Sequence, residues 1–269
     1  MSQPAAEIIA VSVGNTRTRV GVFHDRELDH SSATANTDLE AVAAAIMEAP
    51  VSNPGAPLVV ASVNDPIAEP LLALVRPRLV ARGGDIYRFG KDLTIPIQNA
   101  LTDDSTVGQD RLLNAMGAFA RAKQACIVVD AGTAVTVDFV DGQGVFQGGA
   151  IAPGLNMMLK ALHQHTAALP SIKYEPIPDG TPFGKDTRGA MLLGVQSAIL
   201  GLVRVVTERY AEFYGAYPQI IATGGDARTL FENDDLIEHI VPDLILVGMQ
   251  AACRIQLGLD GEDEIEDLS

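Results

Sequence analysis

Two short glycine turns carry polar residues suited to phosphate chemistry. They are Ser12-Val-Gly-Asn-Thr and Asp130-Ala-Gly-Thr-Ala, and each follows an apolar stretch typical of a buried strand. In such a turn the outward-facing amides bind an anion, and a carboxylate at the strand tip holds the counter-cation. A single turn of this kind is more often a tight hairpin with glycine at positive φ. Two in matching positions, with Thr223-Gly-Gly after a later strand, favour a nucleotide site.

A third motif, Gly108-Gln-Asp-Arg, precedes a pattern of apolar residues at helical spacing. Asp110 and Arg111 are therefore expected in the first turn of a helix. Alone, they would be a helix cap and a surface arginine. Beside a phosphate site, Asp110 could accept a proton from a substrate hydroxyl, and the planar guanidinium of Arg111 could bind an anionic group.

Other candidate motifs fail on spacing. Residues 180–187 resemble a P-loop, but they are one residue short between the glycines, and Asp186 follows the lysine where Ser or Thr is needed. His163 and His165 face different sides of an expected helix, and the other histidines are scattered, so a zinc site is not expected. Cys126 and Cys253 lie in apolar patterns without C-x-x-C spacing, which predicts two buried free thiols.

Composition limits the class of protein. The chain has 269 residues, 47% hydrophobic and 20% charged, which excludes a disordered chain. Its net charge of -15 disfavours nucleic acid as a partner. We find no uninterrupted apolar run of the roughly 20 residues that cross a bilayer, and no leader pattern, so we expect no membrane partner and a cytoplasmic location. Acidic residues crowd the C-terminus, where we expect a solvated tail rather than an interaction segment.

The elements that position these motifs alternate between strands and helices. Two strands surround Gly14, and a capping box beginning at Thr37 predicts a helix that stops at Pro50. A strand at 58–62, a helix from Asp65 and a strand at 86–89 follow, then a loop over 90–107 and a helix over 109–123. Further strands are expected at 126–130, 135–140, near 145, at 219–222 and at 244–247, and helices at 155–165 and 187–214.

The second set of elements repeats the first. Aligning the two turns superposes Gly14 on Gly132 and Ser12 on Asp130, which suggests an internal duplication. We therefore predict an α/β protein of two duplicated ribonuclease H-like (actin-like) half-domains with a cleft between them. The expected divisions are residues 1–122, residues 123–258 and an acidic tail over 259–269.

In these motifs the sequence resembles the type III pantothenate kinases, members of the acetate and sugar kinase, Hsp70 and actin superfamily. The resemblance runs from about Ile9 to Met249. Besides the three motifs above, it is carried by the segments at 148–154, 166–170, 184–194, 223–225 and 242–248. Two departures stand out. The family's first motif begins with aspartate where this chain has Ser12, and its Tyr and Pro before G-x-D-R are replaced by Leu101 and Asp104.

The resemblance implies a reaction and a site. The γ-phosphoryl group of Mg-ATP would pass to the primary hydroxyl of pantothenate, the first step toward coenzyme A. Asp110 would be the catalytic base, Asp130 would hold a monovalent cation (potassium or ammonium), and family members are homodimers with sites at the interface. The implied substrate-binding residues are Gly108, Gln109, Asp110, Arg111 and Thr187, and the implied ATP-binding residues are Ser12, Val13, Gly14, Asn15, Thr16, Arg17, Thr18, Arg19 and Thr133.

Two alternatives remain open at this point. One is a catalytically impaired or inactive homologue that binds nucleotide or a pantothenate-like ligand as a regulator, which Ser12 favours. The other is a kinase for a different small hydroxy acid. Retention of Asp110, Arg111, Asp130, Thr133 and Thr187 favours an active enzyme, because a protein kept only for binding needs no base.

Overall fold

The computed structural model describes residues 7–178 and 180–256, which form two compact units. Unit 1 comprises residues up to 123, residues 143–146 and the segment from 243 onward, and unit 2 comprises residues 124–142 and 147–242. The acidic tail predicted at 259–269 lies outside the described residues. The grouping is not sequential, because the last helix belongs with the first sheet. The boundary between half-domains that the sequence repeat predicts, at residues 122 and 123, stays a prediction.

Unit 1 is built on a five-stranded sheet with the order β3-β2-β1-β4-β5. The central strand β1 (Glu7–Val13) pairs antiparallel with β2 (Arg17–His24) and parallel with β4 (Leu58–Ser62). The outer strands are β3 (Glu27–Ala35), antiparallel to β2, and β5 (Ile86–Arg88), parallel to β4. No other helix or strand is assigned between β5 and residue 109, as the sequence predicted for 90–107.

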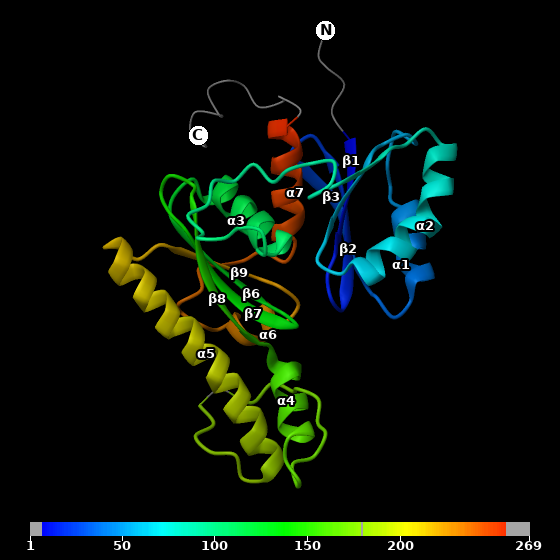
Figure 1. The fold of residues 1–269 in the computed structure, drawn as a ribbon. Coiled ribbons are helices and arrows are strands. Elements are labelled where there is room, and N and C mark those ends of the chain that lie inside the picture. The colour runs from blue at the N-terminus through cyan, green and yellow to red at the C-terminus, as the bar shows by residue number, and fades with distance from the viewer. Residues whose placement is uncertain (1–6, 179, 257–269) are drawn as a thin grey trace. The chain divides into compact units, whose positions relative to one another are not determined.

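Helices cover both faces of this sheet (Figure 1). Ile9, Val11 and Val13 pack with α1 (Leu39–Met47) and α2 (Asp65–Ala81). Ile8 and Ala10 point the other way, toward α3 (Gln109–Ala122) and α7 (Leu244–Gln256). Because side chains alternate along a strand, Ser12 belongs to the α3 and α7 face. The face that carries Ser12 is thus also the face against which the Asp110 helix packs.

Unit 2 repeats this plan. Its sheet has the order β10-β9-β6-β7-β8, formed by β6 (Cys126–Ala131), β7 (Ala134–Val140), β8 (Phe146–Pro153), β9 (Gln219–Thr223) and β10 (His239–Ile240). As in unit 1, the central strand β6 pairs antiparallel with its hairpin partner β7 and parallel with β9. The two sheets share one connectivity, so the duplication predicted from the glycine turns extends to the strand order.

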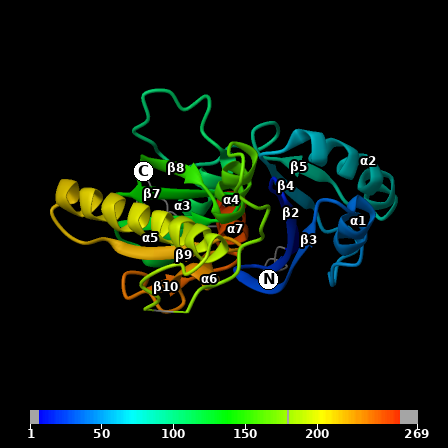
Figure 2. The same cartoon turned by 90° about the horizontal axis from the view of Figure 1, so that it is seen from below.

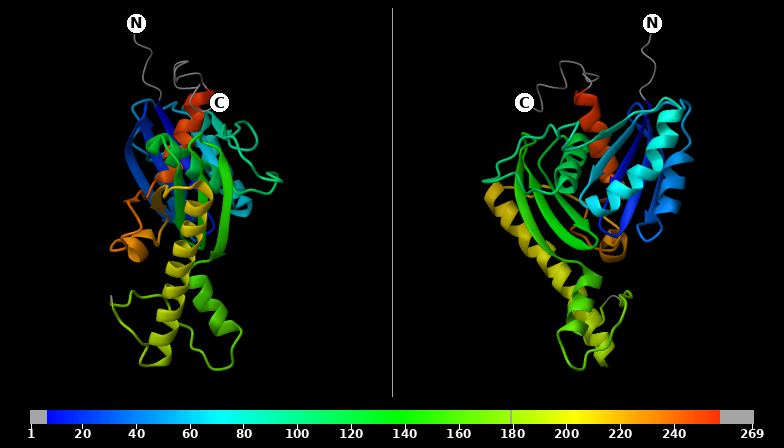
Figure 3. Two further views of the ribbon diagram at one scale, coloured as in Figure 1. Left: turned by 90° about the vertical axis from the view of Figure 1, so that its left-hand side faces the viewer. Right: turned by 45° about the vertical axis from the view of Figure 1, so that its right-hand side comes forward.

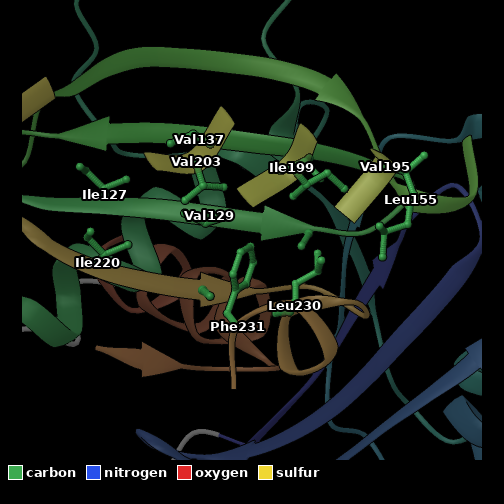
Figure 4. Close-up of a cluster of buried hydrophobic side chains, with 14 of the residues drawn as sticks. Ile127, Val129, Val137, Leu155, Val195, Ile199, Val203, Ile220, Leu230 and Phe231 are labelled. Atoms are coloured by element: carbon green, nitrogen blue, oxygen red, sulfur yellow. The ribbon is translucent and has the colours of Figure 1, made fainter. Parts of the chain in front are cut away.

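One face of the second sheet is covered by the longest helix, α5 (Thr187–Tyr214), as Figure 2 shows from below. Val195, Ile199 and Val203 of α5 meet Val129 and Val137 of the sheet in a buried apolar cluster (Figure 4). The N-terminal part of α5 extends past the sheet and pairs with α4 (Leu155–Gln164), as both views in Figure 3 show. The short helix α6 (Ala227–Phe231) closes the same cluster with Leu230 and Phe231.

The structure corrects several local predictions. Residues 244–247 begin α7 and are not a strand, because Leu246 is buried at helical spacing with Met249 and Cys253. The N-cap of α1 is Asp38, whose side chain accepts a hydrogen bond from the amide of Ala41, so the capping box is off by one residue. Helix α1 ends at Met47, before Pro50. Three elements were not predicted: β3, which is largely exposed, and the very short α6 and β10.

Candidate active site

The first glycine turn connects β1 to β2 in unit 1. The amide of Gly14 donates to the carbonyl of Arg17 at 3.0 Å, and a Cβ at Gly14 would lie 3.0 Å from that oxygen. The φ of Gly14 is not positive, so close approach of two main-chain segments explains this glycine. Asn15, Thr16 and Arg17 are exposed at the tip, where their polar groups can meet a ligand.

A residue that sequence reasoning missed braces this turn. Asn36 is buried and donates through Nδ2 to the carbonyl of Gly14 at 2.8 Å. Its Oδ1 accepts from the hydroxyl of Thr18 at 2.8 Å, and its main-chain amide donates to the carbonyl of Thr16. The side chain of Thr18 is therefore occupied within the protein, and that of Val13 is buried in the core. At these two predicted ATP-binding positions only the main chain can meet a ligand.

Arg19, at the end of the same motif, has a partner far along the chain. Its guanidinium lies 2.9 Å from Oδ1 of Asp243, and the other carboxylate oxygen, Oδ2, accepts from the hydroxyl of Ser31 at 2.8 Å. Asp243 directly precedes α7, and its carbonyl accepts the amide of Leu246. Arg19 thus ties the second strand to the start of the last helix, a contact that nothing in its local sequence indicates.

The motif at 108–111 forms the first turn of α3, as predicted. Gly108 is the N-cap, and the main-chain amide of Arg111 donates to Oδ1 of Asp110 at 2.9 Å. Gln109 donates through Nε2 to the carbonyl of Phe89 at 3.1 Å, so it anchors this turn to the end of β5. The guanidinium of Arg111 lies over the ring of Phe146, 5.5 Å from its centroid. This cation–π contact restricts the position of the guanidinium, which can recognise a carboxylate at two points.

The electrostatics of Asp110 suit a proton acceptor. Burial raises the pKa of its carboxyl above the ordinary 3.8, although the amide and the charge of Arg111 act in the opposite direction. A carboxylate with a raised pKa binds a proton more strongly than an exposed one. This is the direction in which enzymes tune a general base that works near neutral pH.

The second glycine turn, in unit 2, is organised around Asp130 at the end of β6. Gly224 follows β9 with φ +96°, and a Cβ there would lie 2.4 Å from Oδ1 of Asp130 and 2.2 Å from the carbonyl of Ala131. Likewise a Cβ at Gly154 would lie 2.0 Å from the carbonyl of Gly132. These two glycines let the loop after β9 and the N-terminus of α4 pack directly against the turn.

Gly132 itself has a different property. Its φ is not positive, and a Cβ there would meet nothing within 4 Å. Neither backbone strain nor a neighbour in the described chain therefore requires glycine at this position. The amide of Gly154, the N-cap of α4, donates to the carbonyl of Thr133, and no side chain caps that helix. An open glycine turn beside an uncapped helix N-terminus is suited to binding an anion.

A hard cation would find oxygen ligands at this turn. Asp130 supplies a carboxylate next to main-chain carbonyls, a donor set that fits potassium or magnesium better than a soft metal. Among residues 7–178 and 180–256, no three His, Cys, Asp or Glu side chains are grouped as a metal site. In unit 1 the corresponding position is Ser12, which is buried and uncharged. The carboxylate of the turn thus occurs in one copy only.

Thr187 is the first residue of α5 and is exposed. The N-cap Asp186 accepts from the amide of Gly189 at 2.6 Å, which explains why lysine is followed by aspartate in the segment that resembles a P-loop. Leu101 and Asp104, the two departures before Gly108, lie in the segment before α3, where Asp104 accepts from the side chain of Asn99 at 3.3 Å.

Comparison with known proteins identifies the family. The profile of the type III pantothenate kinases matches residues 8–209. The chain belongs to the type III pantothenate kinase family. A type III pantothenate kinase of Rhodopirellula baltica is 41% identical over 206 residues, which cover 70% of each chain. One from Desulfosudis oleivorans is 31% identical over 252 residues, covering 90% of this chain and 97% of that one.

Solved structures share the fold of this type III pantothenate kinase family member at much lower identity. A protein of Campylobacter jejuni assigned to the Baf family of transcriptional activators has a TM-score of 0.61 and 18% identity, covering 93% of this chain and all of that one. A protein of Sinorhizobium meliloti assigned as a 2-dehydro-3-deoxygalactonokinase has a TM-score of 0.54 and 13% identity, covering 93% and 99%. The predicted fold class, α/β with a duplicated sheet, is confirmed by the two five-stranded sheets of one strand order and by this shared fold.

Proposed function

We propose that this protein phosphorylates pantothenate with ATP, giving 4'-phosphopantothenate in the first step of coenzyme A synthesis. The observation that carries the proposal is the family match over residues 8–209, which contains both glycine turns and the 108–111 motif. In this reaction the primary hydroxyl of pantothenate attacks the γ-phosphorus, the bond to the β,γ-bridging oxygen breaks, and ADP leaves. Positioning and charge neutralisation supply most of the catalysis in such transfers.

We assign Asp110 as the group that accepts the hydroxyl proton. Its raised pKa and its place in the first turn of α3 support this role. Arg111 would bind the carboxylate of pantothenate, and its cation–π contact with the ring of Phe146 restricts the position of its guanidinium. Gly108 leaves room for the Asp110 side chain, since a Cβ there would lie 2.4 Å from Oδ1 of Asp110. Thr187 would contact pantothenate bound to the second subunit.

We further propose that the Ser12–Arg19 segment and Thr133 contact ATP. The exposed tip of the first turn and the open space over Gly132 support main-chain contacts to phosphate oxygens. Magnesium bound to ATP and a monovalent cation, potassium or ammonium, would neutralise phosphate charge. Asp130 is the residue we assign to the monovalent cation, because its carboxylate adjoins main-chain oxygens. Ser12 can offer magnesium only a hydroxyl.

We propose a homodimer whose contacts include the uncovered side of α5. Val205 is 49% exposed and Phe213 79% exposed on this helix, although both are apolar. By length and composition α5 could also cross a membrane, with an 18-residue window of mean hydropathy 1.8. Only 28% of that window is buried, although the other side of α5 packs along the sheet of unit 2 through Val195, Ile199 and Val203. We therefore propose that a second copy of the chain covers this side of α5. We also propose a cytoplasmic location, with neither nucleic acid nor a membrane as a partner.

A coupled ADP-release assay tests the function. The chain is supplied with ATP, magnesium and potassium, with pantothenate as acceptor and, in parallel, with other small hydroxy acids. We expect ADP release that depends on pantothenate and on potassium. Calorimetry on the same sample separates the alternative: pantothenate or ATP binding without turnover would identify a regulator in place of an enzyme.

A further inference from the structure

The main-chain N–H of Asn15 belongs to the exposed tip of the first glycine turn, and the peptide that contains it is held from one side. The carbonyl of Gly14 accepts a hydrogen bond from Nδ2 of Asn36 at 2.8 Å, so it faces this buried residue. A trans peptide is planar, with its C=O and N–H on opposite sides. The N–H of Asn15 therefore points away from Asn36.

Glycine at position 14 makes such a restraint necessary. A Cβ at Gly14 would lie 3.0 Å from the carbonyl of Arg17, so the turn needs a residue without a side chain there. Glycine also restricts the backbone least, so the peptide after it can rotate easily. The hydrogen bond from the amide of Gly14 to the carbonyl of Arg17 holds the peptide before Gly14. The bond from Asn36 holds the peptide after it.

Asn36 is itself fixed in one orientation. Its Oδ1 accepts from the hydroxyl of Thr18 at 2.8 Å, which determines that the nitrogen of the side-chain amide faces Gly14. Its main-chain amide donates to the carbonyl of Thr16 at 3.0 Å. Two residues later, Asp38 caps α1, so the chain after Asn36 is anchored to a helix. Both the side chain and the main chain of Asn36 are thus held by the protein alone.

We infer that Asn36 is a positioning residue for the phosphates of ATP, because it holds the N–H of Asn15 in a donating direction. The inference rests on the proposed function, in which the Ser12–Arg19 segment contacts ATP. Asn36 acts through the turn, since its side-chain oxygen and nitrogen both have partners within the protein. A hydrogen bond from a main-chain N–H to a phosphate oxygen is charge-assisted, so loss of its direction weakens nucleotide binding.

The isosteric substitution Asn36→Asp tests the inference. It keeps an oxygen that can accept from Thr18, but it removes the donor to the carbonyl of Gly14. With magnesium and β,γ-imido-ATP as the probe, calorimetry on the full chain should show at least about tenfold weaker binding, the factor expected when one charge-assisted hydrogen bond is lost. In the kinase assay the KM for ATP should rise similarly, while kcat and the KM for pantothenate change less than about threefold.

A second variant removes the same restraint without adding a charge. Thr18→Val deletes the hydroxyl that orients the side-chain amide of Asn36, and the buried side chain of Thr18 does not itself meet a ligand. We expect weaker binding of the probe, by a smaller factor than with Asn36→Asp. The combined variant should lose less than the product of the two factors, because the two residues act through one network. If Asn36→Asp melts below the assay temperature, Thr18→Val carries the test.

The matched control is Asn53→Asp, which makes the same chemical change in the same unit. Asn53 is exposed, and its main-chain amide donates to the carboxylate of Glu7 at 2.7 Å. Glu7 is the first residue of β1, whereas Gly14 follows the last, so the control lies at the opposite end of that strand. We expect this variant to bind the probe with the affinity of the parent chain.

Nuclear magnetic resonance with ¹⁵N-labelled asparagine reports the N–H of Asn15 directly. In the parent chain, the probe should move the amide proton of Asn15 downfield, and at saturating probe Asn36→Asp should lose this shift. Parent affinity in both Asn36→Asp and Thr18→Val would overturn the inference, and the proposed function would stand if the chain still phosphorylated pantothenate. A parent chain that binds no nucleotide would overturn both.

Discussion

At the scale of residues, burial of the Asp110 carboxyl affects both the stability of the fold and the expected pH dependence of the reaction. Burial raises its pKa in the folded state, so its favourable contribution to stability is present below the unfolded pKa, near 3.8, and is lost as pH rises through the folded value. At neutral pH the ionised carboxylate therefore costs stability. We expect kcat/KM to fall as pH drops through the raised pKa, because only the carboxylate can accept the proton.

The substitution Asp110→Asn tests both properties at once. An amide cannot accept the hydroxyl proton, and general-base help is typically worth about 10² to 10⁴-fold in rate. We expect turnover to fall by that factor while pantothenate and ATP binding remain, with a higher Tm at pH 7. Steady-state kinetics, calorimetry and thermal melting on one preparation measure the three effects. Turnover within about a factor of two of the parent would make Asp110 a helix residue without a catalytic role.

Ser12 stands where the family resemblance implies an aspartate. Magnesium prefers one or two carboxylates beside the phosphates, and Ser12 offers only a buried hydroxyl. We expect Ser12→Asp to raise kcat/KM for ATP about tenfold, which corresponds to about 1.4 kcal/mol in the transition state. Initial rates at limiting ATP measure it. A parent enzyme that is already fast, with no gain from Ser12→Asp, would show that another carboxylate serves the metal.

At the scale of elements, the crossing of α3 and α7 sets the position of the helix that carries Asp110. A Cβ at Gly248 would lie 1.8 Å from the carbonyl of Leu113, and one at Gly117 would lie 2.5 Å from that of Leu244. The two helices can pack this closely only because both positions lack a side chain. We expect Gly248→Ala to lower the free energy of unfolding by about 1–3 kcal/mol or more, since the clash is with backbone.

Denaturant unfolding measures this loss, and Gly201→Ala on α5 is the control. A Cβ at Gly201 meets nothing within 4 Å, so alanine should leave stability unchanged or raise it, as expected when alanine replaces glycine in a helix. If Gly248→Ala behaved like Gly201→Ala, the close contact of α3 with α7 would not be a constraint on the fold.

At the scale of the whole molecule, the uncovered side of α5 predicts the oligomeric state. Val205 and Phe213 present apolar surface that no described residue of the chain covers fully. We expect sedimentation to show a dimer at micromolar concentration, and Val205→Glu to give the 28.4 kDa monomer without loss of folding. A monomer in the parent chain would refute the homodimer, and partition into vesicles would favour the membrane as the partner of this helix.

The sequence by itself determined the features that depend on local periodicity and short motifs. Short apolar runs predicted the buried strands on both sides of each glycine turn, helical spacing predicted α3 and α5, and the repeated turn predicted an internal duplication. The motif at 108–111 placed Asp110 in the first turn of a helix, where the structure has it. These properties follow from neighbours in the chain, so they can be inferred without the fold.

Only the tertiary structure decided contacts between residues far apart in sequence. Nothing near Asn36 or Asp243 indicates that they hold the first glycine turn and Arg19, because those partners meet only when strands and helices assemble. The burial that raises the pKa of Asp110 arises in the same way. Local pattern determines which elements form, whereas long-range packing determines which side chains they bring together.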